Sequence, residues 1–88
     1  QVGMFISHSR IHGFGDRELY KFNKRTMEIC RDFIRLRYRL MPYIWGSAEA
    51  CVRRSVPMMR PLVVDWQNDP NTWNLYDQFL FGDSLLVA

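Results

Sequence analysis

The stretch Met4-Phe5-Ile6-Ser7-His8-Ser9-Arg10-Ile11-His12-Gly13-Phe14-Gly15 joins a short apolar run to a loop of hydrogen-bonding side chains. The apolar run stops at Ser7, and both histidines of the chain follow within the next five residues. The two glycines let the backbone turn and pass close to an opposing group. Enzymes with α/β folds build sites from such loops at the carboxyl ends of buried strands. The stretch therefore predicts an α/β fold whose remaining elements hold this loop in place.

The order of elements predicted for the whole chain is strand, loop, long helix and strand. This order corresponds to one β/α repeat followed by the next strand. We expect strands at residues 2–6, 56–66 and 84–88. At its short length, the segment 2–6 also fits the end of a buried helix, and residues 74–81 fit either a short helix or the approach to a strand. Residues 62–64 are a continuous apolar run, which is typical of a parallel strand buried on both faces.

The long helix is predicted from the residue period that follows Asn23, itself a good N-cap. Arginines at positions 31, 35 and 39 line one face, whereas Arg37 lies nearer the apolar stripe and is expected to have an acidic or carbonyl partner. Pro42 predicts a kink or a break, after which helical character resumes over residues 43–52. The apolar stripe consists of Ile29, Phe33, Leu36 and Leu40, widened by Cys30, Ile34 and Met41.

Composition places the chain among globular proteins. Its 88 residues fit at most one small domain, and 15% of them are aromatic, which is high for a small domain that stands alone. The chain begins with Gln1 and stops at Ala88 inside a predicted strand, so we expect a piece of a longer protein. No apolar run approaches the roughly 20 residues that span a membrane.

Charge and cysteine content are less informative. The net charge is +3, and because the arginines cluster on one helix we favour a solvated helix face over an anionic partner. Cys30 and Cys51 match no metal-binding spacing, and the sequence leaves open whether they are two buried thiols or form a disulfide.

The residue best placed for chemistry is His12, which follows the predicted strand end and precedes a glycine. It suits a hydrogen bond to a ligand hydroxyl, although spacing alone favours a loop histidine satisfied by backbone groups. For Arg10 we favour an ion pair that shapes the loop, with Asp16 or Glu18 as the partner, over binding of an anion or a sugar hydroxyl. Asp65 follows a predicted strand, but no spacing identifies a proton-transfer pair, a metal site or a phosphate-binding loop.

Four segments resemble motifs of glycoside hydrolase family 31, the family of α-glucosidases and α-xylosidases. They occur in the family's order and cover essentially the whole chain. The segments are Ser9-Arg10-Ile11-His12-Gly13 (an Arg-x-His segment), Leu36-Arg37-Tyr38-Arg39-Leu40-Met41-Pro42-Tyr43-Ile44 ("LRYRLLPYLY"), Met59-Arg60-Pro61-Leu62-Val63-Val64-Asp65-Trp66 ("RPLFLEF") and Phe81-Gly82-Asp83-Ser84-Leu85-Leu86-Val87-Ala88 ("GDxLLVAP").

The resemblance implies the C-terminal portion of a (β/α)8 TIM barrel that runs into the start of a β-sandwich domain. Residues 1–66 would be the last β/α units of the barrel, with the eighth strand at about residues 59–65. Residues 67–88 would be the connection and the first strand of the sandwich. The family consists of retaining exo-glycosidases, in which a nucleophile aspartate and an acid/base aspartate form and break a covalent glycosyl intermediate.

The resemblance also implies that both of these aspartates precede Gln1. On that basis no catalytic role is expected for Asp16, Asp65, Asp77 or Asp83, and residues 1–88 alone are expected to be inactive.

By the same resemblance, His12 hydrogen-bonds hydroxyls of the sugar in the −1 subsite, and Arg10 lies beside it without touching the sugar. Residues 7–13 are closer to the α-xylosidase version of the motif, so we favour an α-xyloside over an α-glucoside. No cofactor or metal is expected, and the expected partners are a small carbohydrate and the remainder of the same chain, with a homo-oligomer left open. The rival interpretation, a nucleic-acid-binding module built on the arginine-rich helix, is disfavoured, as is a membrane partner.

Overall fold

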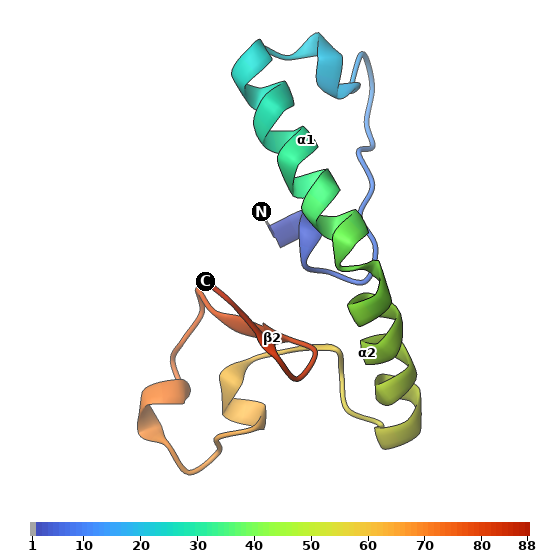
Figure 1. Ribbon diagram of the computed structural model, residues 1–88. Helices are drawn as coiled ribbons and strands as arrows, with labels where there is room; N and C mark the ends of the chain where they lie inside the picture. The colour runs from blue at the N-terminus through green and yellow to red at the C-terminus, as the bar shows by residue number, and fades with distance from the viewer. Residues whose placement is uncertain (1) are drawn as a thin grey trace. The chain divides into compact units, whose positions relative to one another are not determined.

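The computed structural model describes residues 2–88 (Figure 1). The chain separates into two compact units, Gln1–Met41 and Pro42–Ala88. The first unit contains two short 3-10 helices, η1 (Val2–Met4) and η2 (Leu19–Lys21), and the long helix α1 (Lys24–Arg39). Helix α2 (Met41–Arg54) opens the second unit, which ends in a small sheet.

Helix α1 begins where the sequence predicts and ends at Arg39, three residues before Pro42. The side chain of Asn23 accepts a hydrogen bond from the backbone N–H of Thr26 at 2.9 Å, which satisfies one of the free donors of the first turn. The helix ends at Arg39, and the N–H of Leu40 bonds to the carbonyls of Leu36 and Arg37. Helix α2 then starts afresh with Pro42 in its first turn, where a missing N–H costs little. The predicted break is confirmed.

The predicted strand at residues 2–6 is wrong. Residues 2–4 form η1, and no strand of the described chain pairs with this segment. Two of its carbonyl groups, those of Met4 and Ile6, instead accept hydrogen bonds from the side chain of Arg37. An apolar run of this length forms a strand only when another strand lies beside it, which local sequence does not report.

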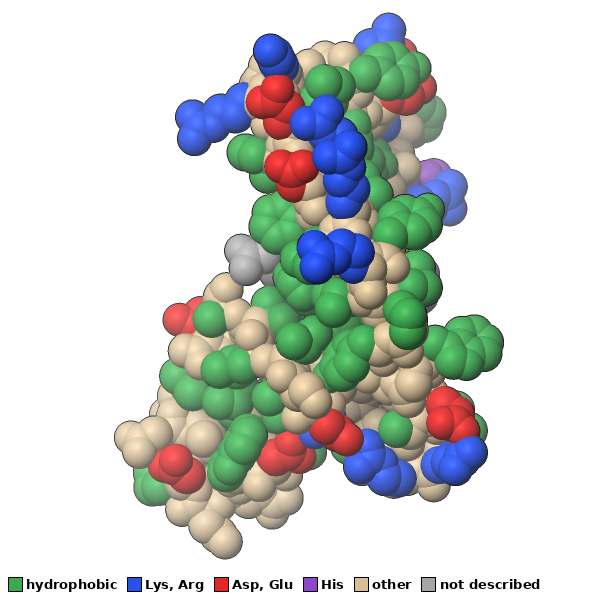
Figure 2. Space-filling view, in the orientation of Figure 1, with side chains coloured by type: hydrophobic (Ala, Val, Ile, Leu, Met, Phe, Trp, Pro, Cys, Tyr) green, Lys and Arg blue, Asp and Glu red, His purple; other side chains and the backbone are tan. Residues whose placement is uncertain are grey.

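The faces of α1 follow the predicted pattern, with less burial than the pattern suggests. No residue of α1 is buried, and Ile29 remains 48% exposed. On the charged face, Asp32 lies 3.9 Å from the guanidinium groups of both Arg31 and Arg35. Figure 2 shows the basic and acidic side chains interspersed over this helix. Exposed pairs of this kind contribute about 0–1 kcal/mol each, so they are typical of a solvated helix face.

The second unit is built around a three-stranded antiparallel sheet in the order β1-β2-β3. The strands are β1 (Met59–Arg60), β2 (Phe79–Phe81) and β3 (Leu85–Val87), and the 3-10 helices η3 (Leu62–Val64) and η4 (Pro70–Thr72) lie between β1 and β2 in sequence. In register, Arg60 lies opposite Leu80, and Leu80 lies opposite Leu86. The buried apolar side chains of the described residues are Ile44, Leu80, Phe81 and Val87.

This sheet corrects one strand prediction and confirms another. Residues 62–64 form η3 instead of a buried parallel strand, and Val64 is 41% exposed. Pro61 explains the difference, because it offers no N–H to a ladder while its carbonyl accepts the N–H of Val64 at 3.1 Å and starts a tight turn. The short strand β1 precedes this turn and pairs antiparallel with β2. The prediction at residues 84–88 is confirmed by β3, and the ambiguous segment 74–81 ends in β2.

The two cysteines of the chain, Cys30 and Cys51, form no disulfide; both are free and half-buried. Among residues 2–88 the structure contains no helix whose length and hydropathy would allow it to cross a membrane.

Candidate functional site

The segment between η1 and η2 carries the three polar residues singled out in the sequence, His8, Arg10 and His12, and all three are exposed. His8 Nδ1 lies 3.1 Å from the hydroxyl oxygen of Ser7. Within residues 2–88, neither His12 nor Arg10 takes part in a hydrogen bond or an ion pair. The backbone contacts that would satisfy an ordinary loop histidine are therefore not made, and the imidazole of His12 keeps both nitrogens available to a ligand.

An open hollow surrounds His12. It is lined by Ile11, His12, Gly13, Gly15, Arg17 and Glu18. Gly13 has a φ of 153°, and a Cβ there would lie 2.6 Å from the Arg17 guanidinium, so the guanidinium packs directly against this glycine. Arg17 Nε also donates to the carbonyl oxygen of Phe14 at 3.0 Å. The backbone angle of Gly13 favours glycine on the far side of His12.

The expected ion pair of Arg10 with Asp16 or Glu18 is not formed. Asp16 pairs instead with Lys21 at 3.1 Å. The physical reason is local, because η2 brings Lys21 back toward the carboxylate five residues before it, while Arg10 lies on the other side of the two glycines in the sequence. Arg10 is consequently an exposed cation beside His12.

The start of the loop is fixed by a residue of α1. Arg37 Nη1 donates to the carbonyl oxygens of Met4 at 2.7 Å and Ile6 at 2.8 Å, and Nη2 donates to the carbonyl oxygen of Ser7 at 2.8 Å. The prediction of a carbonyl partner for Arg37 is confirmed. Because charge-assisted hydrogen bonds are stronger than neutral ones, these contacts hold residues 4–7 firmly against the helix.

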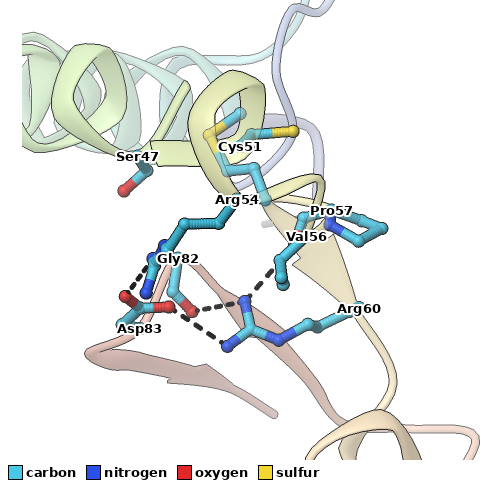
Figure 3. A pocket seen from close by; sticks show the side chains of 9 residues that line it. Ser47, Cys51, Arg54, Val56, Pro57, Arg60, Gly82 and Asp83 are labelled. Carbon is cyan, nitrogen blue, oxygen red and sulfur yellow. Dashed lines mark hydrogen bonds and ion pairs between the residues drawn. The ribbon is translucent and has the colours of Figure 1, made fainter. Parts of the chain in front are cut away.

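A second polar cluster lies in the unit Pro42–Ala88 and centres on Arg60, which is only 6% exposed. Its guanidinium binds Asp65 through Nε and Nη2, the latter at 2.8 Å, and Asp83 through Nη2 at 3.2 Å. Nη1 donates to the carbonyl oxygens of Pro57 and Gly82, as Figure 3 shows. The hydrogen bonds to Asp65 raise the pKa of Arg60 above its usual value. Every side of this buried cation is therefore satisfied by the protein itself.

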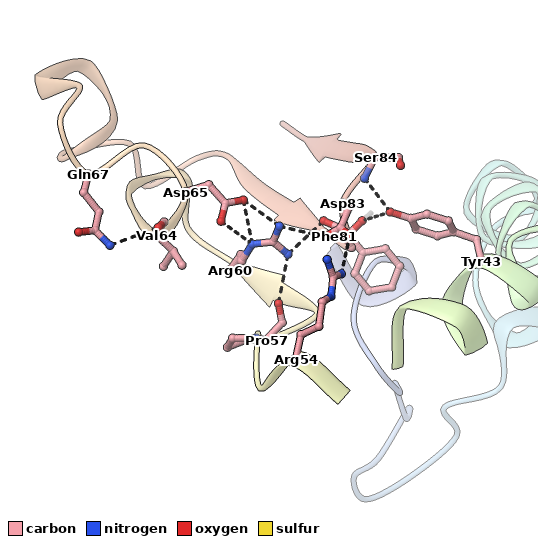
Figure 4. A network of polar contacts seen from close by, with 11 residues as sticks. Tyr43, Arg54, Pro57, Arg60, Val64, Asp65, Gln67, Phe81, Asp83 and Ser84 are labelled. Atoms are coloured by element: carbon pink, nitrogen blue, oxygen red, sulfur yellow. Dashed lines mark hydrogen bonds and ion pairs between the residues drawn. The ribbon is translucent and has the colours of Figure 1, made fainter. Parts of the chain in front are cut away.

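The turn between β2 and β3 completes the cluster (Figure 4). Asp83 lies 2.5 Å from Arg54 Nη2, and this hydrogen bond, with a smaller contribution from Arg60, lowers the pKa of Asp83. The hydroxyl group of Tyr43 donates to the carbonyl oxygen of Phe81 at 2.7 Å and accepts from the N–H of Ser84 at 3.0 Å. Asp83 lies in the turn between the two strands, and its ion pair with Arg54 ties this turn to α2.

Sequence reasoning did not single out Arg60 as an individual residue. The available signal was a charged residue between the apolar Met59 and the Pro61-Leu62 pair. A cation at such a position is rarely buried without an acidic partner. The partners Asp65 and Asp83 were instead considered as isolated carboxylates.

Comparison with known proteins identifies the family. The family model described as the glycosyl hydrolases family 31 TIM-barrel domain matches residues 1–47, and the family's C-terminal domain matches residues 55–88. The chain belongs to glycosyl hydrolase family 31.

Individual relatives carry two different activity names. Over 91 residues the chain is 37% identical to "Alpha-glucosidase 2" of Bacillus thermoamyloliquefaciens, covering all of this chain and 12% of that protein. Over 89 residues it is 35% identical to an "Alpha-xylosidase" of Saccharolobus solfataricus, again covering all of this chain and 12% of the relative. The chain thus spans about an eighth of the length of these curated relatives.

Among solved structures, the chain resembles a GH31 α-xylosidase from a soil metagenome complexed with xylose. The TM-score is 0.92 at 28% sequence identity, and the match covers 100% of this chain and 16% of that one.

Proposed function

We propose that these residues belong to an enzyme that hydrolyses α-linked glycosides with retention of anomeric configuration, and that His12 binds the sugar in the −1 subsite. The observation that supports this proposal most directly is an exposed imidazole without a partner among residues 2–88, in a glycine-bounded hollow of a chain that belongs to a glycosidase family. A neutral imidazole offers one donor and one acceptor, which suits a pair of adjacent sugar hydroxyls. Arg10 contributes positive charge beside this ring without contacting the sugar.

The two catalytic aspartates of the proposed reaction lie outside residues 1–88. Asp65 is engaged by the buried guanidinium of Arg60, and Asp83 is shared between Arg54 and Arg60. Both carboxylates are therefore already engaged by cations of this chain. The contribution of this chain is then to hold the sugar. Hydrogen bonds to its hydroxyls that strengthen at the oxocarbenium-like transition state lower the barrier.

We propose an α-xyloside as the substrate, in preference to an α-glucoside. Residues 7–13 resemble the α-xylosidase version of the motif, and the structural relative with a TM-score of 0.92 is an α-xylosidase complexed with xylose. The α-glucosidase relative at 37% identity is the reason to keep the glucoside as the alternative.

We also propose that residues 1–66 form the last units of a (β/α)8 barrel and that residues 67–88 begin a β-sandwich domain. The remainder of the same protein and a small carbohydrate would then be the partners of this chain. The family matches, to the barrel domain over residues 1–47 and to the C-terminal domain over residues 55–88, support this order of the two domains but not a boundary at residue 66.

The test uses the full-length protein with aryl α-xyloside and aryl α-glucoside substrates. We expect a higher kcat/KM for the xyloside, and proton NMR should show the α-anomer of the sugar as the first product. Faster turnover of the glucoside would contradict the substrate and leave the reaction class standing. A β-anomer as the first product, or no turnover of any α-glycoside, would contradict the reaction class.

A further inference from the structure

We infer that Arg37 is a positioning residue for the sugar-binding loop, acting through the backbone of residues 4–7 without contacting the sugar. The inference rests on the function proposed for His12. The observation behind it is independent of His12, because it concerns how the loop is attached to α1 and not what the loop binds.

The geometry of Arg37 is that of a clamp. Three backbone carbonyl groups converge on one guanidinium, from Met4 at 2.7 Å, Ile6 at 2.8 Å and Ser7 at 2.8 Å. The donors and acceptors are separated by 30 or more positions in sequence and belong to the same compact unit. A planar guanidinium with several fixed donors can serve three acceptors at once, whereas the single ammonium of a lysine has no such fork.

The loop has few other attachments. Within the described chain, residues 7–17 make no backbone–backbone hydrogen bond. Beyond His12 the loop is fixed by Arg17, which donates to the Phe14 carbonyl, and by the Asp16–Lys21 pair. The clamp at Arg37 and these contacts therefore bracket residues 8–13 from both sides. With one bracket removed, the loop would sample more conformations, and His12 would be correctly placed in a smaller fraction of molecules.

The fraction of molecules whose loop places His12 correctly determines how KM and kcat respond to the loss of Arg37. A sugar binds only to molecules whose loop is in place, so the apparent affinity falls in proportion to the competent population. Once the sugar is bound the loop is in place, and the chemical step is affected less. Loss of the clamp should consequently raise KM more than it lowers kcat.

The test compares Arg37→Lys with Arg39→Lys in the full-length protein. Both changes keep the positive charge on the same helix, and the side chain of Arg39 is exposed and makes no hydrogen bond or ion pair within residues 2–88. We expect Arg37→Lys to raise KM by about tenfold with a smaller change in kcat, and to speed amide hydrogen exchange in residues 5–15. Arg39→Lys should change neither property. Added guanidinium at millimolar concentration should partly restore the KM of Arg37→Ala.

Two results would overturn the inference. One is an Arg37→Lys enzyme whose KM and exchange rates equal those of Arg39→Lys. The other is a lower melting temperature with an unchanged KM, which would make Arg37 a residue of stability alone. If the unsubstituted protein turns over no α-glycoside, the proposed function fails. The exchange rates of residues 5–15 then still decide whether Arg37 fixes the loop.

Discussion

The two polar clusters of this chain, one in each compact unit, satisfy their hydrogen-bonding groups in opposite ways. Around Arg60, each donor of a buried guanidinium finds an acceptor within the same unit, from Asp65, Asp83, Pro57 and Gly82. Around His12, the imidazole is exposed and has no partner within residues 2–88. Polar groups that are fully satisfied by their own protein stabilise the fold, and polar groups left open are available to a ligand.

The contrast also separates residues that look alike in sequence. Arg10 and Arg60 each have an apolar residue next to them in the sequence. Asp65 comes at the end of a segment where a strand was expected, and Asp83 comes shortly after β2. In the structure Arg60 and the two aspartates share one network, while Arg10 is free of ion pairs among the described residues. We therefore expect substitutions in the Arg60 network to change stability, and substitutions in the loop around His12 to change sugar binding.

The largest effect is expected for His12→Ala in the full-length protein. We predict a fall in kcat/KM of about 100-fold, equivalent to about 3 kcal/mol of transition-state stabilisation, with a melting temperature close to that of the unsubstituted enzyme. His8→Ala is the matched control, because the contact of His8 is with the neighbouring Ser7 and its kinetics should change little. Unchanged kinetics in the His12 variant would remove it from the sugar site.

A somewhat smaller effect, on stability, is expected for Arg60→Met. Removing the buried cation leaves Asp65 and Asp83 without their shared partner, and we predict a loss of about 2 kcal/mol in the free energy of unfolding. Denaturant titration of the full-length protein measures it, with Arg53→Met as the control because Arg53 makes only an exposed pair with Glu49. Equal stability of the two variants would show that the network contributes nothing beyond a surface ion pair.

Gly82→Ala should destabilise by about 1–2 kcal/mol. Gly82 has a φ of 65°, and a Cβ there would collide with the Tyr43 hydroxyl and lie 2.6 Å from the hydroxyl oxygen of Ser47. The control is Gly46→Ala within α2, where a Cβ meets nothing within 4 Å and helix propensity predicts a slight gain. The melting temperatures of the two variants should thus move in opposite directions, and a shift of both in the same direction would contradict the tight packing assigned to the β2–β3 turn.

The smallest effect concerns pH. The hydrogen bond from Arg54 lowers the pKa of Asp83 in the folded protein, so the stabilisation by ionised Asp83 is complete above its usual pKa and is lost as pH falls through the lowered one. Asp83→Asn lacks this contribution at every pH. The stability gap between the unsubstituted protein and this variant should therefore be largest near neutral pH and narrow below about pH 4. A gap that stays constant down to pH 2 would show that the charge of Asp83 is unimportant.

Local signals in the sequence predicted the helical part of the chain well. Asn23 has the side chain needed to cap α1, Pro42 cannot continue a helix, and Arg37 on an apolar stripe requires an acceptor. Each of these inferences depends on residues within a few turns of one helix. The family was also recognisable from sequence, because each of its four motifs is a continuous stretch of residues.

The errors arose where the outcome depends on distant residues. Residues 2–6 have no neighbouring strand within the described chain, and residues 62–64 follow a proline that starts a turn, so apolar character alone did not make either segment a strand. Within its cluster Arg60 contacts a residue 23 positions away, and the sequence gives no direct sign of their proximity. Burial of a charge becomes evident only when the fold brings its partners together.

The most direct test of the distinction between the two clusters is a crystal structure of the full-length protein with xylose bound. We predict an imidazole nitrogen of His12 within about 3.2 Å of a sugar hydroxyl, with the contacts of Arg60 to Asp65 and Asp83 unchanged from the sugar-free protein. A sugar bound in the −1 subsite with His12 turned away from it, or a sugar held by Asp65 or Asp83, would contradict the account.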